Sequence, residues 1–100
     1  MNITITARKF KARQTLKDFI HEEVSGLRKY NDDILSADVI LSYLNSKESL
    51  KSAEIILQVP GQTLSANEDT NEFEKSVSAS VEKLSRQLRK LKTKRTSKSK

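Results

Sequence analysis

The sequence predicts a two-layer α+β sandwich in the order βαβββα, with a four-stranded sheet and both helices on one of its faces. Apolar residues alternate with polar ones in four short segments, a pattern typical of strands that bury one side. In two longer segments they recur every three or four positions, which indicates amphipathic helices. The order of these segments sets the layers, and 100 residues leave room for a single domain.

The N-terminal third predicts one strand and one helix. Over residues 2–8, Ile3, Ile5 and Ala7 fall on one side of the expected strand. Residues 15–30 change to the helical period. The apolar positions of this helix are Leu16, Phe19, Ile20, Val24, Leu27 and Tyr30. Because the connection onward is expected to be right-handed, the first and second strands should be parallel.

Three strands joined by tight turns are expected next, over residues 36–45, 51–59 and 62–67. Residues 46–49 are all polar and predict the first turn. Pro60-Gly61 predicts the second turn, because proline presets φ at its first central position and glycine tolerates positive φ at the next. These strands should form an antiparallel meander, whose face away from the helices is left to solvent or to a partner.

The second helix is expected over residues 71–92, with one narrow apolar stripe. The stripe consists of Phe73, Val77, Val81, Leu84, Leu88 and Leu91. Acidic residues in the first turn and basic residues near the end suit the helix dipole. From residue 93 the chain has no apolar side chain. We therefore expect a domain over residues 1–92 and a basic, disordered tail over residues 93–100.

Charge is distributed unevenly along the chain. Residues 1–82 hold ten basic and thirteen acidic residues, whereas residues 83–100 hold nine basic residues and no acid. This asymmetry favours a polyanionic partner, nucleic acid ahead of membrane, although a basic tail that only improves solubility gives the same pattern. No signal peptide and no apolar run of membrane-spanning length is present, so a cytoplasmic protein is expected.

The residue types needed for catalysis are scarce. The chain has no cysteine and one histidine, His21, which falls on the polar side of the first helix. The acidic neighbours Glu22 and Glu23 do not face each other on a helix, so they do not form an acid–base pair. Two glycines are too few for a phosphate-binding loop. We expect no enzyme, no catalytic residues, no metal site, no cofactor and no small-molecule substrate.

The second helix carries the most informative polar surface. With Leu84 toward the core, Arg86 and Arg89 fall on the opposite side, and Lys83 and Lys90 on one flank. Like charges one turn apart cost a few tenths of a kcal/mol per pair. A solvated face usually alternates in sign, whereas only Glu82 is acidic here. The pattern favours a surface for RNA phosphates.

Aromatic residues limit the mode of RNA binding. Proteins that read single-stranded bases stack them on exposed aromatic rings. Phe19, Phe73 and Tyr30 fall on buried stripes, which leaves Phe10 and Tyr43 as candidates for exposed rings. We therefore expect phosphate contacts and shape to dominate, with base stacking as a minor contribution.

Residues 83–92, KLSRQLRKLK, closely resemble the last-helix signature KLxRQLxKxK of the ribosome hibernation-promoting factor family, also known as the ribosome-associated translation inhibitor or sigma-factor modulation protein family. Weaker likenesses lie at residues 2–4, 27–30, 32–34 and 39–41, so the resemblance runs from residue 2 to about 94. The chain is similar to the short form of the family, since the long form has a second domain that dimerises ribosomes.

The resemblance implies a fold similar to double-stranded RNA-binding domains. It also implies a protein that binds the small ribosomal subunit and its rRNA in the tRNA and mRNA channel, inhibiting translation under stress or in stationary phase. We expect a monomer off the ribosome. The rRNA-binding residues matched to the signature are Lys83, Arg86, Gln87, Lys90 and Lys92. Arg89 is added for its charge, and Arg8 and Lys9 because they follow the first strand.

The chain departs from the family pattern at three positions, and two other functions remain open. Glu74 stands where the family often has tyrosine, Ser78 where it has aspartate, and Arg13 where a threonine caps the first helix. A ribosome-assembly or general RNA-binding factor would use the same basic surface. A protein–protein adaptor, such as a sigma-factor modulator, would instead use the leucine spacing of the second helix.

Overall fold

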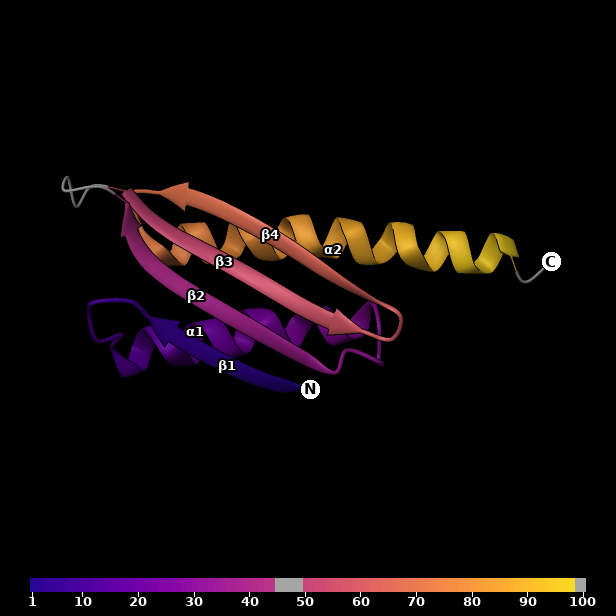
Figure 1. The fold of residues 1–100 in the computed structure, drawn as a ribbon, viewed down its shortest axis with the longest axis horizontal. Helices are drawn as coiled ribbons and strands as arrows, with labels where there is room; N and C mark the ends of the chain where they lie inside the picture. The colour runs from indigo at the N-terminus through magenta and orange to yellow at the C-terminus, as the bar shows by residue number, and fades with distance from the viewer. Residues whose placement is uncertain (45–49, 99–100) are drawn as a thin grey trace.

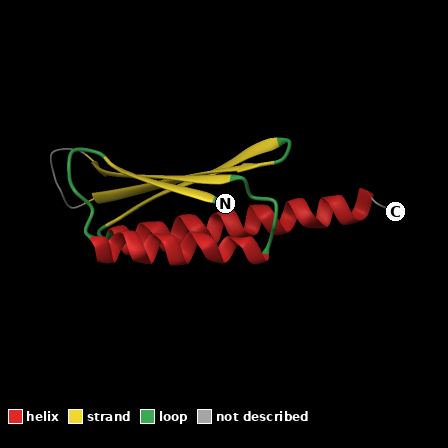
Figure 2. Ribbon diagram, turned by 90° about the horizontal axis from the view of Figure 1, so that it is seen from below, coloured by secondary structure: helices red, strands yellow, loops and turns green. Residues whose placement is uncertain are grey.

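The computed structural model describes residues 1–44 and 50–98 of the chain, and side chains as far as residue 91. Two helices lie side by side under one face of a four-stranded sheet (Figures 1 and 2). The elements are β1 (Asn2–Ala7), α1 (Gln14–Ser25), the 3-10 helix η1 (Gly26–Lys29), β2 (Ser36–Leu44), β3 (Leu50–Val59), β4 (Gln62–Thr70) and α2 (Phe73–Lys98). The predicted fold class and element order are confirmed.

The sheet has the strand order β1-β2-β3-β4. β1 and β2 are parallel, as predicted, and the other two pairs are antiparallel. Ile5, Val39, Ile55 and Ala66 stand opposite one another in a single row across the four strands. This register places the apolar side of every strand on the face that the helices cover.

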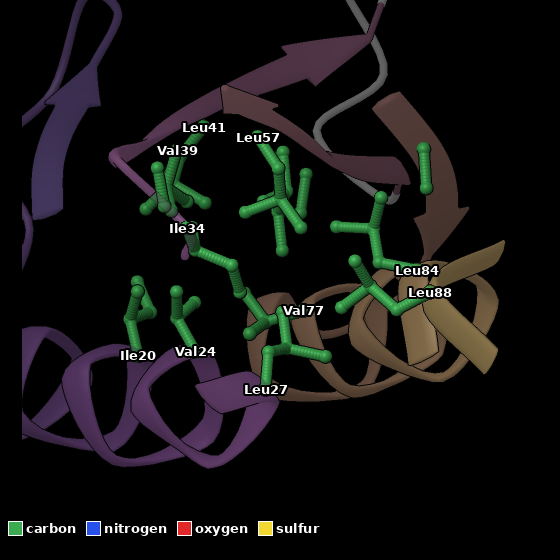
Figure 3. Packing of buried hydrophobic residues seen from close by; sticks show 14 of the residues in the cluster. Ile20, Val24, Leu27, Ile34, Val39, Leu41, Leu57, Val77, Leu84 and Leu88 are labelled. Atoms are coloured by element: carbon green, nitrogen blue, oxygen red, sulfur yellow. The ribbon is translucent and has the colours of Figure 1, made fainter. Parts of the chain in front are cut away.

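The hydrophobic core fills the space between the sheet and the two helices (Figure 3). Ile20 and Val24 enter it from α1, and Leu84 and Leu88 from α2, at 0–1% exposure. The buried members of the predicted α2 stripe are Phe73, Val77, Leu84 and Leu88, and Val81 and Leu91 pack partly buried against them. One face of α2 is thus committed to the domain's own core.

Several predicted boundaries are wrong. The first helix changes to a 3-10 helix at Gly26 rather than continuing to residue 30, and β4 extends to Thr70 rather than ending at residue 67. α2 continues to Lys98, beyond the predicted end at residue 92. No proline or glycine interrupts residues 93–98, and each added residue of a preformed helix gains one backbone hydrogen bond. Residues 99–100 and the predicted turn at 46–49 lie outside the described residues.

Two buried serines attach α2 to the sheet. The Ser76 hydroxyl donates to the Lys51 carbonyl at 2.6 Å, and the Ser80 hydroxyl donates to the Ala53 carbonyl at 2.9 Å. Both serines are fully buried and lie one turn apart, so each meets alternate residues of β3. Burying a hydroxyl group without a hydrogen-bond partner would destabilise the core, and these two bonds supply the partners. They also fix how far along β3 the helix sits.

The two glycines offer a matched stability test. Gly61 has φ +87° in the β3–β4 turn, whereas Gly26 has φ −61° and open space around its Cα. We expect Gly61→Ala to destabilise the domain by about 1 kcal/mol, because a side chain disfavours positive φ. Gly26→Ala should stabilise it by about 0.4–1 kcal/mol, because alanine restricts the unfolded chain. Urea denaturation of the two variants measures both changes, and equal effects would contradict the assigned backbone conformations.

Candidate nucleic-acid interface

The outward face of α2 carries exposed cations. Arg86, Arg89 and Lys90 are exposed, while Leu84 and Leu88 of the same turns are buried against the sheet. This opposition follows from the 100° step of the helix, and it confirms that the cations point away from the leucine stripe. The core therefore holds a rigid helix whose solvent side is basic.

Two of the cations have acidic partners within the domain. Lys83 pairs with Glu68 of β4, and the Arg86 Nε lies 3.3 Å from Glu82 Oε2 one turn earlier. The sequence predicted only Glu82 as a neighbouring acid, so the Glu68 contact was missed. Ion pairs at the surface contribute only about 0.2–1 kcal/mol to stability. A phosphate group of RNA can therefore take the place of either carboxylate. Lys83 is the cation least available to RNA, because it pairs with Glu68. Lys90 has no acidic partner among the residues that the structure describes.

Gln87 has a structural task in this conformation. Its side-chain amide donates a hydrogen bond of 3.0 Å to the Ser65 carbonyl, and the residue is half-buried. Together with the Lys83–Glu68 pair, this bond holds α2 along β4, the last strand in the order of the described sheet. The predicted contact of Gln87 with RNA stays a prediction.

Tyr30 gathers cations from two distant parts of the chain. The Arg89 guanidinium lies 5.7 Å from the centre of the Tyr30 ring, and the Lys29 ammonium lies 5.4 Å from it. Cations this close to an aromatic ring are attracted by its π face. η1 thus brings Lys29, and its exposed neighbour Arg28, beside the basic face of α2. The sequence analysis did not include Arg28 and Lys29 among the candidate RNA contacts. The feature that could have identified them is that two adjacent basic residues precede Tyr30.

The other predicted contact residues lie elsewhere. Arg8 and Lys9 are exposed after β1, and the next residue, Phe10, stacks on Phe73 at the start of α2. Lys90 is seventeen residues from Phe73, or about 25 Å along the helix axis. The structure therefore does not bring Arg8 and Lys9 together with the cations of α2. The side chain of Lys92 lies outside the described residues.

The departures from the family pattern have local explanations. The Ser78 hydroxyl donates to the Glu23 carboxylate at 3.2 Å and so links α2 to α1. Glu74 is exposed in the first turn of α2, where its charge suits the helix dipole. Arg13 occupies the N-cap position of α1 and makes no side-chain capping bond, so the cap is lost. Ser78 therefore has a packing role between the helices.

No catalytic arrangement emerges from the described part of the chain. His21 is exposed on α1, and no group of three or more potential metal ligands forms there. None of the helices in this part is both long and apolar enough to cross a membrane. The basic surface of α2 and η1 is a candidate site on other grounds, since exposed cations from both elements gather there.

Known proteins resemble this chain along nearly its whole length. Residues 3–96 match the model of the family described as Sigma 54 modulation protein / S30EA ribosomal protein. A ribosome hibernation promoting factor of Pseudomonas putida is 28% identical over 97 residues, which cover 97% of this chain and 92% of that protein. A ribosome hibernation promotion factor of Deinococcus radiodurans is 29% identical over 89% of this chain, but only 48% of its own length is matched. A ribosomal subunit interface protein from Coxiella burnetii superposes with a TM-score of 0.84 at 22% identity, covering 93% of this chain and 99% of that one.

Proposed function

We propose, from the premise that this chain belongs to the Sigma 54 modulation protein / S30EA ribosomal protein family, that it is a ribosome-associated hibernation factor. It binds the rRNA of the small subunit in the channel that tRNA and mRNA use, and it inhibits translation under stress or in stationary phase. The general role is supported by relatives that are named ribosome hibernation promoting factors and that match nearly the whole chain. The location on the ribosome rests on the family resemblance and on the basic surface.

The observation that carries the RNA contact is the exposed cationic face of α2, with Arg86, Arg89 and Lys90 on a helix anchored by buried leucines. Cations on a rigid scaffold neutralise phosphates and release their counterions. Such contacts position a protein on RNA without reading its sequence. Specificity then comes from the shape of a folded RNA surface, as a ribosomal channel provides.

The proposal also defines partners and place. The protein is a monomer off the ribosome, takes no small-molecule substrate, performs no catalysis and resides with ribosomes in the cytoplasm. An adaptor that pairs through the α2 leucines is disfavoured, because Leu84 and Leu88 are already buried in the core at 0–1% exposure. A ribosome-assembly factor would use the same basic surface, so the particles that carry the protein must distinguish it.

Ribosome profiles on sucrose gradients test the function. We expect the protein to co-sediment with mature small subunits and intact ribosomes in extracts of starved cells, and to compete there with initiator tRNA. Its share of ribosomes should be much lower in growing cells. Enrichment on precursor particles would support assembly instead, and ribosome association that survives ribonuclease digestion of the exposed rRNA would support a protein partner.

A further inference from the structure

The connection between β1 and α1 forms a second basic segment, which lies near the start of α2 and far from Arg86, Arg89 and Lys90. It reads Arg8-Lys9-Phe10-Lys11-Ala12-Arg13, with four cations and no acid in six residues. All four cationic residues are exposed, and none of their side chains has an ion-pair partner among the described residues. Lys9 has φ 63°, a conformation uncommon for a residue with a side chain. The turn at Lys9 thereby directs Phe10 back toward the domain.

Phe10 lies in a cluster of three aromatic rings at that end of the sheet. Its ring stacks on Phe73 with centroids 5.0 Å apart, and it meets the edge of Tyr43 at 5.1 Å. Phe73 is buried and closes the cluster toward the core, whereas Phe10 is half-buried and Tyr43 is 39% exposed. The two rings predicted to be exposed therefore form one partly exposed aromatic cluster, in which Phe10 and Tyr43 meet edge to face and the Lys51 ammonium lies 5.8 Å from the centre of the Tyr43 ring.

A hollow of ≈ 370 Å³ lies against this aromatic surface. Its volume falls within the range of about 300–1,000 Å³ that small-molecule sites occupy. Lys11 and Arg13, which precede α1, line it together with Lys51 of β3. Glu72 and Glu74, at the start of α2, line the wall on the side of α2. The first turn of α1 borders the hollow without a side-chain cap or an acidic residue, so its N–H groups favour an anion.

We propose that this hollow is a nucleotide-binding subsite, with the base against Phe10 and Tyr43 and the phosphate against Lys11 and Arg13. This inference deepens the proposed function, on which it rests for the presence of RNA. The carboxylates on the α2 wall repel a phosphate, so they fix its position at the α1 wall. Glu74 can instead accept a hydrogen bond from the amino group of a base.

The subsite needs an unpaired base. A base inside a duplex is stacked on its neighbours, so its face cannot reach the rings of Phe10 and Tyr43. The hollow also lies about 25 Å from Lys90, as the helical rise from Phe73 shows. The domain thus has two separated RNA contacts, one for phosphates of a folded surface along α2 and one for a single-stranded nucleotide.

Fluorescence titration with three probes tests the subsite on the full chain. The probes are a ten-nucleotide single-stranded RNA carrying one 2-aminopurine, the same RNA in a duplex, and adenosine 5′-monophosphate. We expect the single strand to bind with quenching of its 2-aminopurine. Phe10→Leu/Tyr43→Leu, which keeps apolar volume but removes both rings, should weaken this binding by about 5- to 20-fold and remove the quenching. Binding of the duplex should not change.

Surface variants keep the test independent of folding. Lys11→Gln/Arg13→Gln should weaken binding of the single strand more than Lys17→Gln, an exposed cation of α1 that does not line the hollow. Displacement of the RNA by adenosine monophosphate would show that a free nucleotide also fits, and its absence would assign the site to RNA alone. The proposal is overturned if the ring variant retains wild-type affinity and quenching. Arg86→Glu/Lys90→Glu should keep the quenching even where ribosome binding is lost, which separates the two proposals.

Discussion

Reversing two charges on α2, in the variant Arg86→Glu/Lys90→Glu, is expected to abolish co-sedimentation with small ribosomal subunits. Both side chains are exposed, and each would meet a phosphate with the wrong sign. Loss of two phosphate contacts lowers the slope of log K against log salt by about 1.4–1.8, and the introduced repulsion lowers affinity further. We expect the affinity for the small subunit to fall by at least about 100-fold, as measured by sedimentation at several salt concentrations.

The fold should survive this change. Exposed substitutions usually alter stability by about 0.5 kcal/mol or less, and the lost Arg86–Glu82 pair is of the same order. Lys17→Glu/Lys75→Glu makes the same change in net charge at exposed positions, one on α1 and one in the first turn of α2, about 16 Å along the helix axis from Arg86, and it should retain most of the binding. If Arg86→Glu/Lys90→Glu still competes normally with initiator tRNA, α2 is not the contact surface.

Leu84→Ala should produce the largest loss of stability. Leu84 is fully buried between α2 and the sheet, at 0% exposure. Truncating such a leucine removes buried apolar surface and leaves a cavity, which lowers the free energy of unfolding by about 2–5 kcal/mol. Since domains of this size are stable by only about 5–15 kcal/mol, much of the stability would disappear. Urea denaturation should show a lower midpoint with a nearly unchanged m-value.

Leu35→Ala is the matched control for this effect. Leu35 is 60% exposed, so the same truncation removes little buried surface and should change stability by about 0.5 kcal/mol or less. A loss of 2–5 kcal/mol corresponds to a decrease in Tm of at least about 8 °C for a domain near this size. Similar effects of the two variants would mean that the leucine stripe of α2 does not form the core.

The sequence by itself determined the elements and the direction of the α2 cations. Hydrophobic periodicity is a local property, because each strand or helix must bury its own apolar side. The same geometry places Arg86 opposite Leu84 without any knowledge of the sheet. The parallel pairing of β1 with β2 follows equally from the helix that connects them in the sequence.

The partners of these side chains were decided only by the tertiary structure. Glu68 and Lys83 are fifteen residues apart, and Tyr30 and Arg89 are fifty-nine apart, so no periodicity connects them. Ser80 gave no sign of burial in the sequence, because its carbonyl partner belongs to another element.

Position within the domain was likewise decided by packing. Arg8 is basic like Lys90, but it lies two residues before Phe10, whose ring stacks on Phe73 at the start of α2, seventeen residues before Lys90. The physical reason is that local pattern dictates which side of an element is buried, whereas long-range packing dictates what each exposed or buried group then meets.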